Sequence, residues 1–298
     1  MAKISFITSD DRFYNVSRAL SLMKTDIVSA ISNAKNVVIK ANCYCSSYQL
    51  SATHLDTLDA LLDFISPHVK NQITLAESCA LGTALEAFHN YKYFDIQEKY
   101  DLALVDLQKD QYQTATSNQD SSDKRKISLP KTLVESDFII SVTPPKTHGI
   151  YNYFGSISNL LPSHLDPTAQ SHKSFVRSLR INKQSSIASA SSTQHNNLIS
   201  SLYQIMPASL SVVDGYATMQ GNGPGSDGEL AATHWAVVST SAPLADLLSI
   251  NLLEFELENV TYLAEILKEA NLDNSIIVGD EWKKYITNIR KHPNFSNV

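Results

Sequence analysis

The sequence predicts an α/β fold with a mostly parallel or mixed sheet flanked by helices. Three short runs of β-branched and aliphatic residues, at 37–40, 73–76 and 102–105, have the length and composition of buried strands. Two segments with helical spacing lie between them, and this alternation favours parallel strands joined by right-handed crossovers. Because 43% of the 298 residues are hydrophobic and 18% are charged, the chain can bury a large core.

The two helices between these strands have recognisable boundaries. Apolar residues recur every three or four positions from Leu55 to Ile65. This segment is therefore predicted to be a helix, with Thr53 as its N-cap and Pro67 beyond its end. The second helix is expected over residues 83–91.

The middle of the chain has fewer periodic segments. Residues 108–126 are polar and lack an apolar period, which predicts a flexible surface insertion. A strand is predicted at 138–142 and is ended by the double proline at 144–145. Residues 150–196 are rich in Ser, Asn, Gln and His, and a long irregular stretch of this kind is either functional or mobile.

The second half returns to strands and helices. The predicted elements are a helix at 197–205, a strand at 210–213, an apolar run at 235–239, helices at 244–257 and 260–267, and a last strand at 276–278. We expect a single α/β unit over residues 1–298. Within it, lobes 1–150 and 197–298 would be joined by the irregular segment 151–196 and would share a crevice at the C-terminal ends of the strands.

Glycine is concentrated in one segment. The chain has only nine glycines, and five of them fall within residues 215–228. Glycine permits positive φ and a close approach of the backbone to another group. Because this segment follows the strand at 210–213, we interpret it as a loop in which Gly221, Asn222 and Gly223 face a ligand. The alternative is a long hairpin or Ω-loop that needs several tight turns.

Polar side chains follow four of the predicted strands. They are Lys40 with Asn42, Glu77 with Ser78, the tripeptide Lys146-Thr147-His148, and Asp214 before the glycine-rich segment. The carboxyl ends of parallel strands open on one edge of a sheet, so these groups are predicted to line one crevice. Taken singly, each is also compatible with a solvated edge or a helix terminus. Two lysines in one crevice predict binding of phosphate, sulfate or a polycarboxylate, because low-dielectric walls focus the local charge.

The start of the helix at 83–91 offers another anion site. Ser78, Gly82 and Thr83 lie where the free N–H groups of a helix N-terminus can hold an anion. No lysine follows Gly82 as in a Walker loop, and no G-x-G-x-x-G fingerprint is present. Nucleotide binding is therefore not predicted.

Histidines and cysteines define no clear metal site. His148 and His172 adjoin the polar central segment and are the candidates for proton transfer or metal ligation, although a lone histidine is more often structural. Cys43 and Cys45 form a C-x-C pair without a second pair to complete a four-thiolate site. We interpret the cysteines as small apolar fillers and expect no iron–sulfur cluster intrinsic to the chain.

Composition restricts the classes of partner. A net charge of −6 gives no overall attraction for nucleic acid. No apolar run is long enough to span a membrane, and the N-terminus lacks a signal-peptide apolar segment, so a cytoplasmic location is expected. Three cysteines exclude a disulfide framework.

Taken in order, these clusters resemble the family catalogued as domain of unknown function 362. The resemblance covers roughly residues 36–250. The matching segments are Val37 to Asn42, Ile73 to Ser78 with Gly82-Thr83, Leu129-Pro130 through Asp137 to Ile140, Pro145 to His148, Ser156 to Leu160 with Asn159, and Asp214-Gly215 with Met219 to Pro224.

The resemblance implies an α/β fold and little settled biochemistry. Many relatives carry a ferredoxin-like module with two four-iron clusters, which implies redox or metal-cofactor chemistry in the family. This chain departs from the family pattern where charge matters. Gln220 stands where relatives usually have glutamate, Ser158 where they have lysine, Ala242 where they have aspartate and Ala41 where they have proline. A neutral amide cannot act as a general base, so shared catalytic chemistry is in doubt.

Two functional hypotheses follow. In the first, the chain is an enzyme that acts on a small anionic metabolite or cofactor precursor. Its catalytic groups would be His148, Lys146, Glu77 and Asp214, and its ligand-binding groups would be Lys40, Asn42, Ser78, Gly82, Thr83, Thr147, Asn159, Gly221, Asn222 and Gly223. In the second, it is a non-catalytic binding or accessory protein for iron–sulfur or metal-centre assembly. The cofactor, the reaction type and any homo-oligomer or redox partner protein are left open by the sequence.

Overall fold

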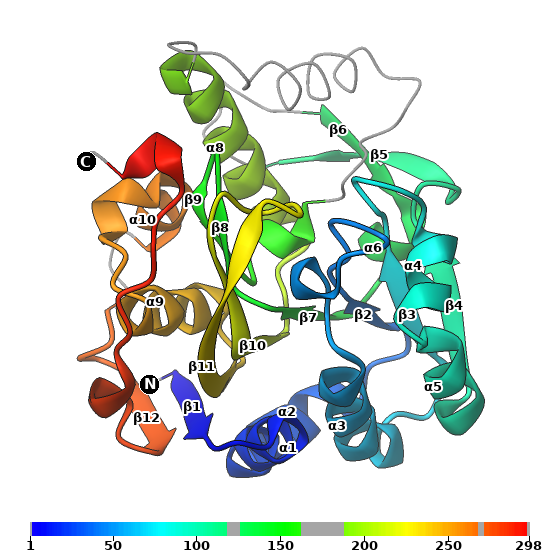
Figure 1. The fold of residues 1–298 in the computed structure, drawn as a ribbon. Coiled ribbons are helices and arrows are strands. Elements are labelled where there is room, and N and C mark those ends of the chain that lie inside the picture. The colour runs from blue at the N-terminus through cyan, green and yellow to red at the C-terminus, as the bar shows by residue number, and fades with distance from the viewer. Residues whose placement is uncertain (1, 118–125, 162–187, 268–270, 297–298) are drawn as a thin grey trace.

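The computed structural model describes residues 2–117, 126–161, 188–267 and 271–296, with side chains from residue 196 onward in the third of these segments (Figure 1). Its main element is a ten-stranded sheet. Eight strands follow one another across this sheet in the order β12 (Ile276–Gly279), β1 (Lys3–Thr8), β11 (Gly228–Ser239), β10 (Leu210–Gly221), β7 (Phe138–Thr143), β2 (Val37–Lys40), β3 (Ile73–Glu77) and β4 (Leu102–Asp106). The short strand β8 (Lys146–His148) pairs with β10 and with β9 (Asn152–Phe154).

The sheet is mostly parallel, as predicted. Strands β4, β3, β2, β7 and β10 run in one direction. Strand β11 is antiparallel to its neighbours β10 and β1, and β12 is parallel to β1. Strands from both halves of the chain are therefore hydrogen-bonded into one continuous sheet.

Helices cover both faces of this sheet (Figure 1). One face carries α1 (Arg12–Leu22), α2 (Lys24–Ile31), α3 (Leu55–Ile65), α4 (Ala84–Asn90) and α5 (Tyr93–Tyr100). The other carries α6 (Lys131–Val134), α8 (Ala188–Ile205), α9 (Ala242–Leu252) and α10 (Thr261–Leu267). Short 3₁₀ helices include η1 (Gln49–Ser51) and η3 (Ser158–Leu160).

Alternation along the strands divides the core into two. Ile39 packs with the helices of the first face, whereas its neighbour Val38 packs with those of the second. Val212 and Val213 divide in the same way. Successive side chains of a strand point to opposite faces, so a continuous apolar run fills both cores at once. This explains why the central strands lack a polar–apolar alternation.

The N-terminal strand β1 and the helices α1 and α2 were not predicted from the sequence. Strand β1 lies between β12 and β11, so the first residues of the chain are paired with the last third.

Residues 108–126 were expected to be one flexible insertion, and this was wrong for part of the segment. Tyr112–Thr116 forms β5, which pairs with β6 (Lys126–Pro130) in a small separate sheet. Strand β5 has a polar composition and no fully buried residue, so its sequence did not indicate a strand. Its pairing with β6 stabilises it instead.

Two helix boundaries also differ from expectation. The N-cap of α3 is His54 rather than Thr53, and the Thr53 hydroxyl instead donates to Val142 O at 2.8 Å. Helix α9 ends at Leu252, because Glu254 adopts a left-handed φ of 52°. Both differences arise from tertiary contacts or backbone geometry that apolar spacing does not encode.

The glycine-rich segment is a β-hairpin. Strand β10 does not end at Val213 but continues to Gly221, and β11 begins at Gly228. The register shifts between Gly215 and Ala217, and the ring of Trp235 covers Gly215. A Cβ at Gly215 would lie 2.4 Å from that ring, so glycine is required there for packing.

Gly223 also has a packing role that predicts a stability effect. A Cβ at Gly223 would lie 2.5 Å from the backbone oxygen of Thr147, so Gly223→Ala should lower the free energy of unfolding by about 1–3 kcal/mol through overpacking. Gly225→Ala is the matched control, because its nearest neighbour would be Tyr44 at an ordinary 3.7 Å. Urea unfolding of both variants measures the difference. Equal stability of the two variants would show that the hairpin turn tolerates the Cβ at both positions.

Candidate functional site

The carboxyl edge of the parallel strands brings several predicted residues together. Lys40 is the last residue of β2 and Glu77 the last of β3. Their side chains form an ion pair, and Lys40 Nζ also donates to Ala41 O at 2.9 Å. Both side chains are at most 2% exposed. Burial raises the pKa of Glu77, and the neighbouring Lys40 opposes that increase.

A second lysine joins the same network. Lys146 Nζ donates to Asn42 Oδ1 at 2.5 Å and to Ser51 O at 3.3 Å. Asn42 Nδ2 donates to Asn159 Oδ1 at 2.9 Å, and Asn159 Nδ2 donates to Lys40 O at 3.0 Å. Burial lowers the pKa of Lys146 to about 7, while Glu77 acts in the opposite direction. We call these residues, Lys40, Asn42, Glu77, Lys146 and Asn159, the buried polar network.

The charged groups of the buried polar network have their partners within the protein. Both ammonium groups are buried and donate to acceptors within the protein, and they lie in one network rather than on opposite faces of the molecule. A buried charge is costly unless it is paired and hydrogen-bonded, so these contacts hold the loop between β2 and α3 in place.

The tripeptide that contains Lys146 is buried as a whole. His148 Nδ1 accepts from Ile150 N at 3.1 Å, and the imidazole stacks on Tyr151 with ring centroids 4.5 Å apart. Thr147 is buried beneath Gly223. These contacts place the tripeptide inside the fold, against the glycine-rich hairpin.

The expected anion site before α4 contains a carboxylate of the protein itself. Thr83 and Glu86 form a capping box, in which Thr83 N donates to Glu86 Oε2 at 2.9 Å and Glu86 N donates to Thr83 Oγ1 at 3.2 Å. Gly82 has a φ of 103° and packs against the Ser46 side chain. Ser78 is buried at the end of β3. Glu86 thus satisfies a helix N–H that was expected to hold an external anion.

The tip of the glycine-rich hairpin contacts the C-terminal segment. Gly221 N donates to Arg290 O at 2.8 Å, and Arg290 N donates to Gln220 Oε1 at 3.0 Å. Gly221 and Asn222 line a cavity of about 490 Å³ with residues 288–291 and Pro293. Gln220 therefore has a structural contact.

The described residues contain no group of three or more His, Cys, Asp or Glu side chains arranged to hold a metal ion. Cys43 is buried beside Tyr93, and burial raises its pKa. Burial also raises the pKa of Cys79 to about 12. His172 lies outside the described residues.

An open cavity of about 380 Å³ lies at the same edge of the sheet. It is built from residues that follow β1, β2 and β7 and from the hairpin β10–β11. Its lining is Arg12, Tyr48, Gln49, Leu50, Ala52, His54, Pro144, Asp214, Ala217 and Leu230. Of these residues, only Asp214 was a candidate from the sequence. Small-molecule sites in α/β proteins favour this edge, and the volume is within the usual range of ~300–1,000 Å³.

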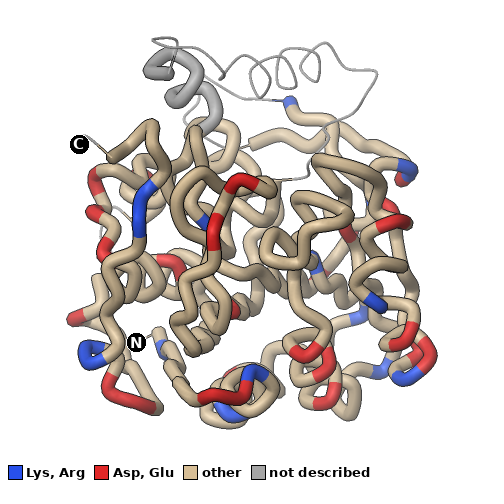
Figure 2. Tube along the Cα trace, viewed as in Figure 1, with Lys and Arg blue, Asp and Glu red and all other residues tan. Residues whose placement is uncertain are grey.

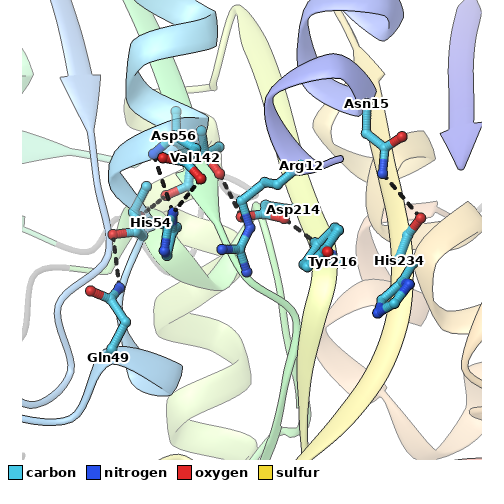
Figure 3. Close-up of polar contacts among 12 residues, drawn as sticks. Arg12, Asn15, Gln49, His54, Asp56, Val142, Asp214, Tyr216 and His234 are labelled. Carbon is cyan, nitrogen blue, oxygen red and sulfur yellow. Dashed lines mark hydrogen bonds and ion pairs between the residues drawn. The ribbon is translucent and has the colours of Figure 1, made fainter. Parts of the chain in front are cut away.

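Asp214 fixes an arginine at the cavity wall. Arg12 Nε lies 3.1 Å from Asp214 Oδ2, which also accepts from Thr57 Oγ1 at 2.5 Å (Figure 3). Asp214 Oδ1 accepts from Tyr216 N at 3.1 Å, and the Arg12 guanidinium stacks over the Tyr216 ring at 4.6 Å. No hydrogen bond joins the two Nη groups of Arg12 to the described part of the chain. The guanidinium is therefore oriented through Nε, and its other donors are left for a ligand.

His54 stands beside Arg12 as a neutral imidazole. Its Nδ1 lies 3.2 Å from Asp56 N at the start of α3 and 3.4 Å from the Asp56 carboxylate. Burial lowers the pKa of His54, and the positive charge of Arg12 lowers it further. In the neutral ring we assign Nδ1 as the acceptor of the helix N–H, because that contact is the shorter. Nε2 is then the N–H donor of the ring.

The sequence carried only weak signals for this pair. Arg12 follows β1 in the run Asp10-Asp11-Arg12, and Asp11 caps α1 by accepting from Tyr14 N. Recognition of β1 would have placed Arg12 at the carboxyl edge of the sheet. His54 directly precedes a predicted helix, which is an N-cap position.

A further buried carboxylate supports the segment that carries Asn159. Asp246 of α9 accepts from Ser156 N at 2.6 Å and from Ile157 N at 2.9 Å. Ser156 and Ile157 lie three and two residues before Asn159, so Asp246 anchors the turn that presents it. Burial raises the pKa of Asp246 to about 7, although its hydrogen bonds favour the ionised form.

Charged residues of both signs are distributed around the described part of the chain, and no described helix is suited to cross a membrane. In the view of Figure 2, Lys and Arg are interspersed with Asp and Glu around the periphery of the described chain. None of the described helices combines the length and the apolar character that a bilayer crossing requires.

Fold and site together define an α/β protein with a ligand-sized cavity at the carboxyl edge of a mostly parallel sheet. The chain belongs to the family described as Domain of unknown function (DUF362), whose model matches residues 37–251. The family resemblance deduced from the motifs is thereby confirmed. A comparison with curated proteins gives no match.

Two solved structures are similar to this chain. The lactate racemase apoprotein from Thermoanaerobacterium thermosaccharolyticum has a TM-score of 0.52 and 15% identity, over 84% of this chain and 57% of that one. A protein from Thermotoga maritima has a TM-score of 0.48 and 11% identity, over 88% of this chain and 60% of that one. The chain thus spans less than two thirds of either protein. At 15% identity, the likeness to the racemase shows the fold alone.

The buried ion pair predicts a non-additive pair of substitutions. Glu77→Gln leaves the Lys40 ammonium buried without its counter-charge, so the free energy of unfolding should fall by about 3 kcal/mol. The double variant Lys40→Met with Glu77→Leu removes both charges and should lose less. Denaturant unfolding of the single and double variants measures this coupling. A double variant that is less stable than Glu77→Gln would contradict the assignment.

Asp246 predicts a pH dependence of stability. Its folded-state pKa of about 7 exceeds the ordinary value of 3.8, so between these values the folded state binds more protons than the unfolded state. The contribution of Asp246 to stability is therefore fully present below pH 4 and is lost as pH rises to about 7. Relative to the parent, Asp246→Asn should gain stability by up to about 1.4 kcal/mol per pH unit in this window. Urea unfolding at pH 4.5 to 8 tests it, and a constant or opposite difference would refute it.

Proposed function

We propose that this chain is an enzyme that acts on a small anionic metabolite, which binds through a carboxylate to Arg12 and His54 in the 380 Å³ cavity. The observation that carries the proposal is an arginine oriented by a buried aspartate, with its Nη groups at an open cavity beside a neutral histidine. The sequence hypothesis of an anionic ligand is kept, while its binding groups move from the buried lysines to Arg12 and His54.

Arg12 supplies the positive charge. A guanidinium presents a planar set of donors that match the two oxygens of a carboxylate. Asp214 and Tyr216 hold it from two sides, so little side-chain entropy would be lost when a ligand binds. Asp214 already accepts two hydrogen bonds and forms an ion pair with Arg12, so we assign it the role of positioning Arg12.

His54 supplies a neutral donor at a helix N-terminus. Its Nε2–H could stabilise negative charge that develops on a ligand oxygen, while burial and the charge of Arg12 lower the pKa of the ring and favour its neutral form. A neutral imidazole held at a helix N-terminus is a known arrangement for polarising a carbonyl group. His54 is thus the side chain that we expect to contact the reacting part of the ligand.

The buried polar network supports this site from within. Lys146 holds Ser51 O, and the adjoining residues Gln49, Leu50 and Ala52 form one wall of the cavity. We therefore assign Lys40, Glu77, Lys146 and His148 structural roles around the site. The similar solved structure is named for an enzyme of a small carboxylate, lactate, but the proposal rests on the cavity, since that likeness concerns the fold.

Binding of small anions tests the proposal. Isothermal titration with acetate, L-lactate, phosphate and sulfate should show binding of the carboxylates that weakens as salt is raised. Arg12→Gln should reduce affinity tenfold or more, on the scale of one lost charge-assisted hydrogen bond worth ~1.5–3 kcal/mol. Arg18→Gln, an exposed arginine on the same helix, is the matched control and should bind as the parent does.

The outcomes separate the alternatives. Equal losses in Arg12→Gln and Arg18→Gln, or a loss only in Lys146→Ala, would move the anion site away from the cavity. Proton NMR of a bound carboxylate incubated with the protein then separates an enzyme from a binding protein. A ligand recovered unchanged after long incubation would favour the non-catalytic hypothesis.

A further inference from the structure

We propose that the ligand is a monocarboxylate with a short apolar substituent, which lies against Leu50, Pro144, Ala217 and Leu230. This inference rests on the proposed function, because it places the carboxylate at Arg12. It adds the chemical class of the remainder of the ligand. The apolar wall faces the same cavity as Arg12, His54 and Asp214.

The hairpin geometry places two of these side chains on one face. Leu230 of β11 pairs with Met219 of β10, and Ala217 lies two residues before Met219. Paired residues share a face of a sheet, as do residues two apart on one strand. Leu230 and Ala217 therefore form one continuous apolar surface at the cavity, and Leu230 is 57% exposed there.

The opposite wall is fixed relative to the hairpin. Tyr48 OH donates to Gly228 O at 2.9 Å and so joins the loop that carries Leu50 to the start of β11. Lys146 holds the same loop through Ser51 O. Because both walls are held by hydrogen bonds, the apolar subsite is already formed before a ligand enters, which favours binding.

The charged groups of the lining exclude a second carboxylate. Among the described residues of the lining, Arg12 is the one permanent cation and Asp214 the one carboxylate, and the lowered pKa of His54 favours the neutral ring. A dicarboxylate would place its second charge against apolar side chains or near Asp214, without a partner. Desolvating an unpaired charge is strongly unfavourable. The lining therefore selects for one carboxylate and against two.

A chain-length series tests the inference. We would titrate the protein with acetate, propanoate, butanoate, pentanoate and succinate by calorimetry. Affinity should rise by about fourfold for each added methylene, the usual effect of burying a CH₂ group, until the cavity is filled. Succinate should bind at least tenfold more weakly than butanoate, which has the same number of carbons. Leu230→Ser should reduce the gain per methylene, and Leu85→Ser is the control, because Leu85 is 54% exposed on α4 outside the cavity.

Failure of this inference is distinguishable from failure of the proposed function. Equal affinity for acetate and pentanoate, with binding still dependent on Arg12, would overturn the apolar subsite and leave the carboxylate site in place. Succinate binding as tightly as butanoate, or an unchanged gain per methylene in Leu230→Ser, would also overturn it. No binding of any member of the series would overturn both.

Discussion

The burial of two lysines at one edge of the sheet is the constraint on which the site depends. Lys40 and Lys146 lie within the protein, so each needs acceptors, and Glu77, Asn42 and Ser51 provide them. Glu77 ends β3, whereas Asn42 and Ser51 belong to the β2–α3 loop, so satisfying the charges also fixes this loop against β3 and β8. That loop forms a wall of the cavity and ends at His54, the N-cap of α3.

The charged side chains at this edge of the sheet form two layers, one buried in the protein and one that faces the cavity. Of the inner groups, Lys40 pairs with Glu77, and Lys146 donates to the neutral oxygens of Asn42 and Ser51. The outer charge, on Arg12, is oriented by Asp214 but remains accessible from the cavity. Such a division suits anion binding, because a ligand does not have to break an internal ion pair to enter. It also explains why the chain, acidic overall, can present a local positive group to a small molecule.

Much of the fold, and less of the site, could be predicted from sequence. Short apolar runs identified β2, β3, β4 and β7, and strand parallelism correctly brought Lys40 and Glu77 together. Exposure could not be predicted, because a lysine at a strand end has the same sequence signal whether it is buried or solvated. Arg12 was missed with β1, whose pairing partners lie more than 200 residues away in sequence. The glycine-rich segment proved to be a hairpin. Its glycines did not distinguish a ligand-facing loop from this hairpin, because close packing against Trp235 and Thr147 also requires glycine.

The most direct test of the central claim is a crystal structure of the protein soaked with butanoate. We predict that the carboxylate oxygens lie within hydrogen-bond distance of Arg12 Nη and His54 Nε2, with the alkyl chain against Leu230, while Lys40 and Glu77 stay paired. A butanoate bound at Lys146 or at the hairpin tip beside Asn222, with the cavity empty, would contradict the assignment.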